Sequence, residues 1–126
     1  YSVIYFTAAG LFDILAENTF GKRQDKDSDV FEHIYDCDLL IIDDLGTELP
    51  NSFTVSQLFI CLNERILRQK STIISTNLAL EDIKSIYSER TFSRISSNYT
   101  ILRITGDDIR IQKKLLNLGG TNDVTP

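Results

Sequence analysis

Four consecutive apolar residues at 39–42 (LLII) are followed directly by two acids, Asp43 and Asp44. A continuous apolar run of this length predicts a strand that is buried on both faces, as in parallel sheets. A parallel sheet needs helices to connect its strands and to cover them. Because ligands of open α/β sheets bind outside the carboxyl ends of the strands, the two acids stand where such a site would lie.

Strand-like and helix-like segments alternate along the rest of the chain. Runs rich in β-branched and aromatic residues predict further strands at 2–7, 71–76 and 99–105. Apolar residues at helical spacing predict helices at 8–18, near 30–35, from 54 onward, at 80–87, at 89–95 and at 109–118. This alternation predicts an α/β fold, a parallel sheet with helices on both faces and right-handed crossovers.

The helix from residue 54 has a predicted start. Thr54 and Gln57 have the spacing of a capping box, in which two side chains satisfy free backbone N–H groups at the first turn. Val55, Leu58 and Leu62 then follow at helical spacing. We therefore expect this helix to open at Thr54 with one apolar face.

Composition and charge exclude several classes of protein. The 126 residues carry a net charge of −5, which argues against a broad basic face for nucleic acid, so any DNA contact should be local. Cys37 and Cys61 form no CxxC pair and His33 is the one histidine, so neither a zinc site nor a disulfide framework is indicated. No stretch reaches the length of a membrane span. We expect a reduced, cytoplasmic protein.

Polar residues at two strand ends are candidates for nucleotide chemistry. Asp43 could coordinate Mg²⁺ through water, since this ion keeps several waters, and Asp44 could activate an attacking water. The alternative is an ordinary buried strand followed by an acidic turn. Asn77 follows the strand predicted at 71–76 and could hold the water or touch a phosphate. Asparagine is also a common turn residue at a strand end.

Arginines form the second group of candidates. Arg90 and Arg94 are four residues apart, so a helix places both guanidinium groups on one face, where they could bind phosphate. The alternative is a local salt bridge. Arg110 could reach a nucleotide or could pair with Asp107 or Asp108. Spacing alone leaves both possibilities open.

The order of these pieces resembles the Walker B, sensor 1, arginine-finger box and sensor 2 series of AAA+ ATPases. Residues 39–46 (LLIIDDLG) are similar to the Walker B segment of DnaC/DnaI-like helicase loaders and IstB-type transposition ATPases. The arrangement Glu89-Arg90-x-x-x-Arg94 resembles the arginine box of that group. The resemblance covers roughly residues 2–114.

This resemblance implies an ATPase that uses ATP and Mg²⁺. The implied roles are metal coordination by Asp43, catalysis by Asp44, sensor 1 for Asn77, arginine finger for Arg94, support of the same contact by Arg90, and sensor 2 for Arg110. An arginine finger acts on the nucleotide of a neighbouring subunit, so self-association is implied too. The implied function is loading of a replicative DNA helicase onto single-stranded DNA. Alternatives are an IstB-type transposition ATPase and a non-hydrolytic AAA+-like interaction module.

The sequence departs from the family at the phosphate-binding loop. No G-x-x-x-x-G-K-[ST] motif occurs, and Gly21-Lys22 does not qualify because Ala16 and Arg23 stand at the other motif positions. We therefore expect a partial AAA+ core over 1–118, truncated at its N-terminal side, and a flexible tail over 119–126. The family's sheet has a further strand beside the one predicted at 71–76, so we expect the sheet either to close up directly or to accept a strand from another chain.

Overall fold

A three-stranded parallel sheet organises the chain. The structure, a computed structural model, describes residues 1–20 and 27–105. Its strands are β1 (Val3–Thr7), β2 (Leu39–Leu45) and β3 (Ser71–Thr76), in the order β1-β2-β3 with both pairings parallel. The predicted parallel α/β fold and the first three predicted strands are therefore confirmed.

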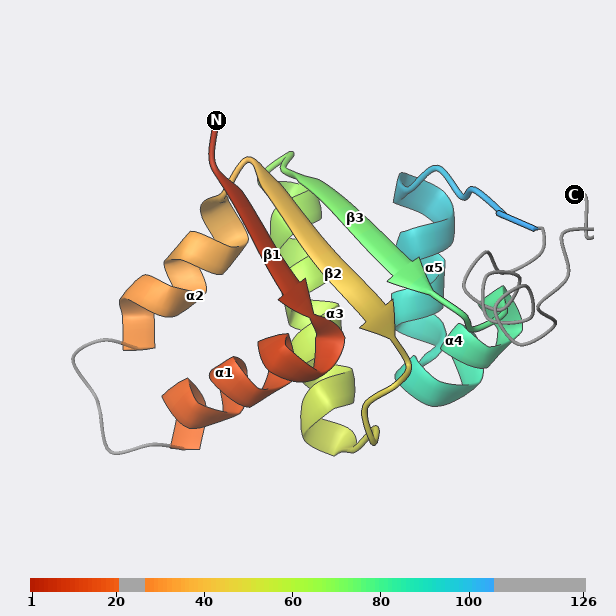
Figure 1. The fold of residues 1–126 in the computed structure, drawn as a ribbon, viewed down its shortest axis with the longest axis horizontal. Coiled ribbons are helices and arrows are strands. Elements are labelled where there is room, and N and C mark those ends of the chain that lie inside the picture. The colour runs from red at the N-terminus through yellow and green to blue at the C-terminus, as the bar shows by residue number, and fades with distance from the viewer. Residues whose placement is uncertain (21–26, 106–126) are drawn as a thin grey trace, which may run out of the picture.

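Five helices accompany these strands in the described part of the chain. They are α1 (Ala8–Phe20) and α2 (Asp27–Asp36) between β1 and β2, α3 (Ser52–Leu67) between β2 and β3, and then α4 (Leu80–Tyr87) and α5 (Glu89–Asn98). Figure 1 shows the three strands side by side, with α3 behind them and α4 and α5 beyond β3. None of the described helices is long and apolar enough to cross a membrane. The helix predicted at 109–118 and the tail at 119–126 lie outside the described residues.

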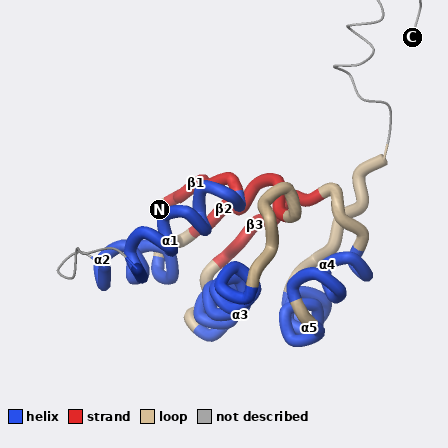
Figure 2. Tube along the Cα trace, turned by 90° about the horizontal axis from the view of Figure 1, so that it is seen from below, coloured by secondary structure: helices blue, strands red, loops and turns tan. Residues whose placement is uncertain are grey.

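The helices bury one face of the sheet. Leu40 and Ile42 of β2 are fully buried in a single apolar core to which all five helices contribute. On the other face Val3, Tyr5 and Ile73 are 58%, 56% and 52% exposed. Figure 2 shows the strands along one side, with α3, α4 and α5 on the other. We expected helices on both faces, but side chains alternate along a strand and only one of the two sets meets a helix in the described residues.

The strand predicted at 99–105 is not formed. Residues 101–105 have no regular secondary structure, and Leu102 and Ile104 are 80% and 93% exposed. A strand exists through pairing with a neighbour, and the sheet order ends at β3, so no strand of residues 1–20 and 27–105 pairs with this segment. The prediction of a fourth strand is therefore wrong, and so is direct closure of the sheet. A strand supplied by another chain stays a prediction.

The helix α3 begins before the predicted residue. Asn51 is its N-cap, and its side-chain oxygen accepts a hydrogen bond from the Thr54 backbone N–H at 2.9 Å. In return the Thr54 hydroxyl accepts from the Asn51 backbone N–H at 2.9 Å. Thr54 therefore closes the capping box rather than opening it, because asparagine is among the strongest N-cap residues.

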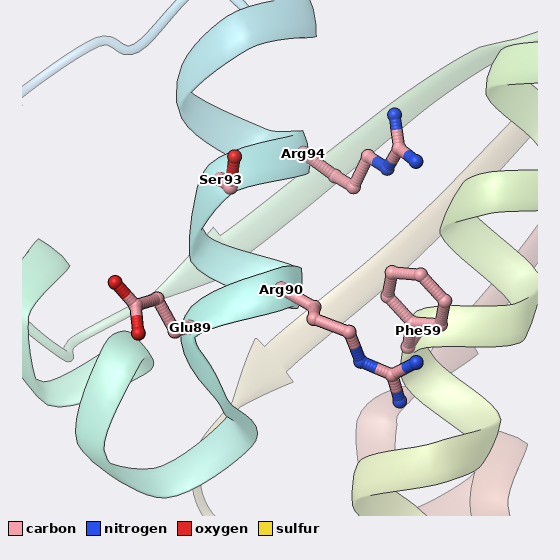
Figure 3. A pocket seen from close by; sticks show the side chains of 5 residues that line it. All are labelled: Phe59, Glu89, Arg90, Ser93 and Arg94. Atoms are coloured by element: carbon pink, nitrogen blue, oxygen red, sulfur yellow. The ribbon is translucent and has the colours of Figure 1, made fainter.

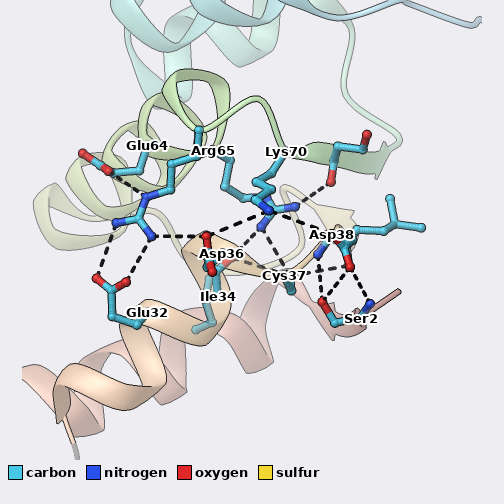
Figure 4. A network of polar contacts seen from close by, with 12 residues as sticks. Ser2, Glu32, Ile34, Asp36, Cys37, Asp38, Glu64, Arg65 and Lys70 are labelled. Carbon is cyan, nitrogen blue, oxygen red and sulfur yellow. Dashed lines mark hydrogen bonds and ion pairs between the residues drawn. The ribbon is translucent and has the colours of Figure 1, made fainter.

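A buried arginine ties the helical layer to the sheet. Arg65 of α3 is fully buried, and its guanidinium donates to the Ile34 carbonyl at 2.7 Å, the Thr72 hydroxyl at 2.9 Å and the Ser71 carbonyl at 2.6 Å. Figure 4 shows this network between α2, α3 and the start of β3. The buried position of Arg65 was not predicted from the sequence, although Arg65 follows Leu58 and Leu62 on the apolar face of α3.

Candidate functional site

The two acids lie at a bulge in β2. Ile42 is opposite Ile74 and Leu45 is opposite Thr76, so three steps along β2 match two steps along β3. One extra residue at this point bends the strand and redirects its side chains. Asp44 accordingly has φ 58°, in the left-handed region that aspartate tolerates better than most residues. The acids therefore occupy the carboxyl edge of the sheet, as predicted, in a strained local backbone.

Two hydroxyls hold the Asp43 carboxylate. The Ser75 hydroxyl donates to one carboxylate oxygen of Asp43, and the Tyr5 hydroxyl donates to the other at 2.6 Å. Ser75 also accepts a hydrogen bond from the Asp44 backbone N–H at 3.0 Å, which ties the bulge to β3. The hydrogen bonds from Ser75 and Tyr5 lower the pKa of Asp43, so the carboxylate is ionised at neutral pH and fixed in direction.

Tyr5 and Ser75 were missed by the sequence analysis. Tyr5 lies on the same face of the sheet as Val3 and Thr7, and Thr7 is opposite Asp43 in the parallel register. The hydrogen bond to Asp43 is also the main reason that the pKa of Tyr5 is raised. Alternation along the first strand places Tyr5 and Thr7 on one face, but the register of the structure is needed to show that Asp43 shares that face.

Asn77 lies at the same edge of the sheet. It directly follows β3 and is exposed, and no hydrogen bond of its side chain is found in the described residues. The preceding Thr76 hydroxyl donates to the Leu45 carbonyl at 2.5 Å and accepts from the Leu78 backbone N–H at 3.0 Å. These bonds join the ends of β2 and β3. The structure thus brings the acids and Asn77 to adjacent strand ends, as predicted.

The two arginines share an exposed face of α5. Arg90 and Arg94, together with Phe59, Glu89 and Ser93, line an open hollow of about 480 Å³ (Figure 3). The Arg90 guanidinium lies over the Phe59 ring of α3, 4.2 Å from its centroid. Ile95 on the opposite side of the helix is buried, as expected. The prediction of a paired cationic face is therefore confirmed.

Within one chain, the acids and the arginines form separate groups. None of the acids at the strand ends lines the hollow that contains Arg90 and Arg94. No ion pair of Arg90 or Arg94 is found among the described residues, so the alternative of a local salt bridge has no support there. Arg110 lies outside the described residues. In residues 1–20 and 27–105, both guanidinium groups therefore lie on an exposed helix face without an acidic partner.

The carboxylate arrangement suits a magnesium ion better than a protein-enclosed metal. No cluster of three or more histidine, cysteine or acidic side chains that could hold a metal occurs in residues 1–20 and 27–105. Mg²⁺ keeps several waters and is bound through one or two carboxylates together with substrate phosphates. Asp43, ionised and held by hydroxyls, matches that donor set.

The fold and the strand-end site define the class of the protein. A parallel sheet with acids and an amide at the carboxyl ends of adjacent strands, followed by an arginine-bearing helix, is the arrangement that the sequence predicted. The family model of the IstB-like ATP binding proteins matches residues 1–117. The chain belongs to this family.

Several solved structures share the fold of this chain. A crystal structure of the DnaC helicase loader superposes with a TM-score of 0.72 at 22% identity, over 82% of this chain and 61% of that one. The replication initiator DnaA bound to AMPPCP and single-stranded DNA gives a TM-score of 0.72 at 20% identity, over 99% of this chain and 39% of that one. AMPPCP-bound DnaA from Aquifex aeolicus gives a TM-score of 0.65 at 21% identity, over 94% of this chain and 37% of that one.

The chain therefore spans less than two thirds of each of these three proteins. No curated protein sequence matches it significantly. At these identities the structural matches establish a shared fold.

Proposed function

We propose that this protein is an ATPase whose active site forms between adjacent copies. The observation that carries the proposal is the separation of the acids from the arginines within one chain. Asp43 and Asp44 stand at the carboxyl edge of the sheet, whereas Arg90 and Arg94 line a different, exposed hollow. A neighbouring copy could bring its arginines to the acids, which would complete a site for a triphosphate.

Each residue at the strand ends has a role in this proposal. Asp43 would help to hold the Mg²⁺ that accompanies ATP. The ion would neutralise the charge that develops on the phosphates during hydrolysis. Asp44 orients and activates the attacking water, and Asn77 at the next strand end holds that water or the terminal phosphate. Ser75 and Tyr5 keep the Asp43 carboxylate ionised and correctly aimed.

The arginines act on the partner's nucleotide. Arg94 is the arginine finger, because its planar guanidinium donates two parallel hydrogen bonds to phosphate oxygens and keeps its charge. Arg90, held over Phe59, supports the same contact between subunits. Arg110 is proposed as a further nucleotide contact. A loop that cradles the phosphates is also needed, and we propose that the complete gene product supplies it.

The proposed cellular role is loading of a replicative DNA helicase onto single-stranded DNA. Support comes from the likeness of the fold to the DnaC helicase loader and to DnaA bound to single-stranded DNA. The net charge of −5 fits local rather than extensive DNA contact. We propose that the protein self-associates and works in the cytoplasm.

A transposition ATPase is the second candidate, because the matching family is described by the IstB-like proteins. The two candidates share the site and differ in the partner. Affinity capture of the complete gene product with purified replicative helicase or transposase separates them. Capture of the helicase supports loading, and capture of the transposase alone contradicts it.

ATP hydrolysis by the complete gene product tests the shared site. Asp44→Asn and Arg94→Ala should each lower kcat by a factor of at least ~100, the size of effect typical of a lost catalytic base or finger. Glu81→Gln, an exposed glutamate of α4, is the matched control and should hydrolyse ATP normally. Normal rates for both site variants in the oligomer would contradict the proposal and favour a non-hydrolytic interaction module.

A further inference from the structure

A half-buried glutamate lies between the two parts of the proposed site. Glu48 follows the Asp43-Asp44 bulge by four residues and belongs to no helix or strand. One of its carboxylate oxygens accepts a hydrogen bond from the Gly46 backbone N–H at 3.0 Å. The other accepts from the hydroxyl of Tyr87, the last residue of α4. Glu48 thus joins the loop after the acids to the end of α4.

The loop that Glu48 holds is tightly constrained. Gly46 has φ +102°, and a Cβ built there would lie 2.5 Å from the nearest side-chain atom of Leu78, which follows Asn77. The Thr47 hydroxyl and backbone N–H both donate to the Asp44 carbonyl, at 2.8 Å and 3.3 Å. These contacts hold the loop, and the Asp44 backbone with it, independently of Glu48.

Tyr87 is an equally constrained partner on the other side. Its ring is fully buried, and burial, followed by the hydrogen bond with Glu48, raises the pKa of its hydroxyl. Only Ser88, which has φ 110° and caps α5, separates Tyr87 from the helix that carries Arg90 and Arg94. α4 and α5 also pack closely against each other. The orientation of α5 therefore depends on where Tyr87 is held.

We propose that Glu48 is a positioning residue that sets the arginine helix α5 relative to the loop carrying the acids of the same subunit. This inference rests on the proposed ATPase function. Glu48 has no part in the chemistry itself. Glu48 fixes the distance between the acids and the arginine helix of one subunit. The acids of that subunit face one neighbour, and its arginine faces the other neighbour. Loss of either hydrogen bond should therefore displace the arginine finger while leaving nucleotide binding intact.

The first test measures ATP hydrolysis and ATP affinity for the complete gene product. Glu48→Gln keeps the size of the side chain but offers one acceptor oxygen instead of two, and Tyr87→Phe removes only the hydroxyl from a ring that still fills the core. Each should lower kcat by about tenfold, with the affinity for a non-hydrolysable ATP analogue unchanged. Wild-type kcat for both variants would overturn the inference, and Glu81→Gln is the control for loss of a glutamate charge on α4.

A second test distinguishes positioning from general damage. Subunits carrying Glu48→Gln are mixed with Asp44→Asn subunits or, separately, with Arg94→Ala subunits. The inference predicts that Asp44→Asn subunits raise the rate above that of Glu48→Gln oligomers, because they supply a correctly placed arginine to intact acids. Arg94→Ala subunits should give no such gain. The reverse pattern would overturn the inference, since it would place the defect at the acids.

Failure of the inference and failure of the proposed function give different results. If Asp44→Asn and Arg94→Ala subunits alone hydrolyse ATP at the wild-type rate, the proposed function itself fails. If both are inactive but Glu48→Gln and Tyr87→Phe are normal, only the positioning role of Glu48 fails. Thermal melting of each variant shows whether a lost rate reflects unfolding.

Discussion

Gly46→Ala should destabilise the protein through two separate costs at one position. The glycine follows Asp43-Asp44-Leu45 and has φ +102°, where an L side chain is strained by about 1–2 kcal/mol. The new methyl carbon would also lie 2.5 Å from Cδ1 and 2.7 Å from Cγ of Leu78, where ordinary carbon contacts are about 3.5–4.0 Å. Relief of such overpacking typically costs about 1–3 kcal/mol.

The net loss should be about 2–4 kcal/mol, since alanine recovers roughly 0.4–1 kcal/mol by restricting the unfolded chain. Urea unfolding, monitored by circular dichroism, measures this loss of stability. Gly10→Ala is the matched control: this glycine lies within α1, and its added Cβ would meet only the Thr7 hydroxyl, at 3.0 Å. That variant should stay within about 1 kcal/mol of wild type, because alanine favours the helix.

A double-mutant cycle separates the two costs. Leu78→Ala removes the clashing side chain, so Gly46→Ala should be about 1–3 kcal/mol less harmful in that background. The backbone cost of about 1–2 kcal/mol should persist. A loss below about 1 kcal/mol for Gly46→Ala alone would refute the reasoning that this loop is fixed by both its backbone and Leu78.

Three further predictions follow from the described contacts. Arg65→Met should lower the free energy of unfolding by about 2–4 kcal/mol, because it leaves buried carbonyls without donors. Arg68→Met breaks only surface ion pairs and should lower it by at most about 1 kcal/mol. Urea unfolding of the two variants compares these losses. Asn51→Ala should cost about 1 kcal/mol by removing the N-cap of α3, also measured by urea unfolding, and an unchanged midpoint would contradict the cap. Ser75→Ala should raise the pKa of Asp43 towards its ordinary value of 3.8, as followed by NMR titration of the carboxyl carbon. The lowered pKa of Asp43 stabilises the folded state at pH values above 3.8, and this stabilisation is lost as the pH falls through the pKa of the folded state. Because Ser75→Ala has less of this stabilisation, the variant should lose less stability than wild type below pH ~4.

The sequence predicted those elements whose local pattern and tertiary environment agree. The run at 39–42 forms β2, although only Leu40 and Ile42 are buried rather than both faces as predicted, and the strand predicted at 71–76 forms β3 with the same bounds. The helix predicted at 80–87 coincides with α4. In these segments the spacing of apolar residues and the turn residues at their ends specify the same structure.

The failures have physical causes outside the local sequence. Residues 99–105 have strand-forming composition, but a strand needs a neighbour to pair with, and none of the strands that the structure describes pairs with this segment. The capping box of α3 was placed three residues late because Thr54 can occupy either position of the motif. The spacing of apolar residues specifies neither which strands pair nor whether Asn51 or Thr54 is the N-cap.

The candidate site shows the same division. The strand-end positions of Asp43, Asp44 and Asn77 followed from the rule that parallel strands share a carboxyl edge. Tyr5 and Ser75 could not be found that way, since their hydrogen bonds to Asp43 depend on the register between three strands and on the bulge in β2. Glu48 was missed for a similar reason, because its partner Tyr87 lies 39 residues away.

Mixing two inactive variants tests the central claim most directly. If the acids of one copy and the arginine of the next form one ATP site, oligomers assembled from equal amounts of Asp44→Asn and Arg94→Ala subunits contain some sites with both groups intact. The account predicts that the mixture recovers roughly a quarter of the wild-type ATPase rate, although neither variant is active alone. A mixture as inactive as its two components would contradict a site shared between copies.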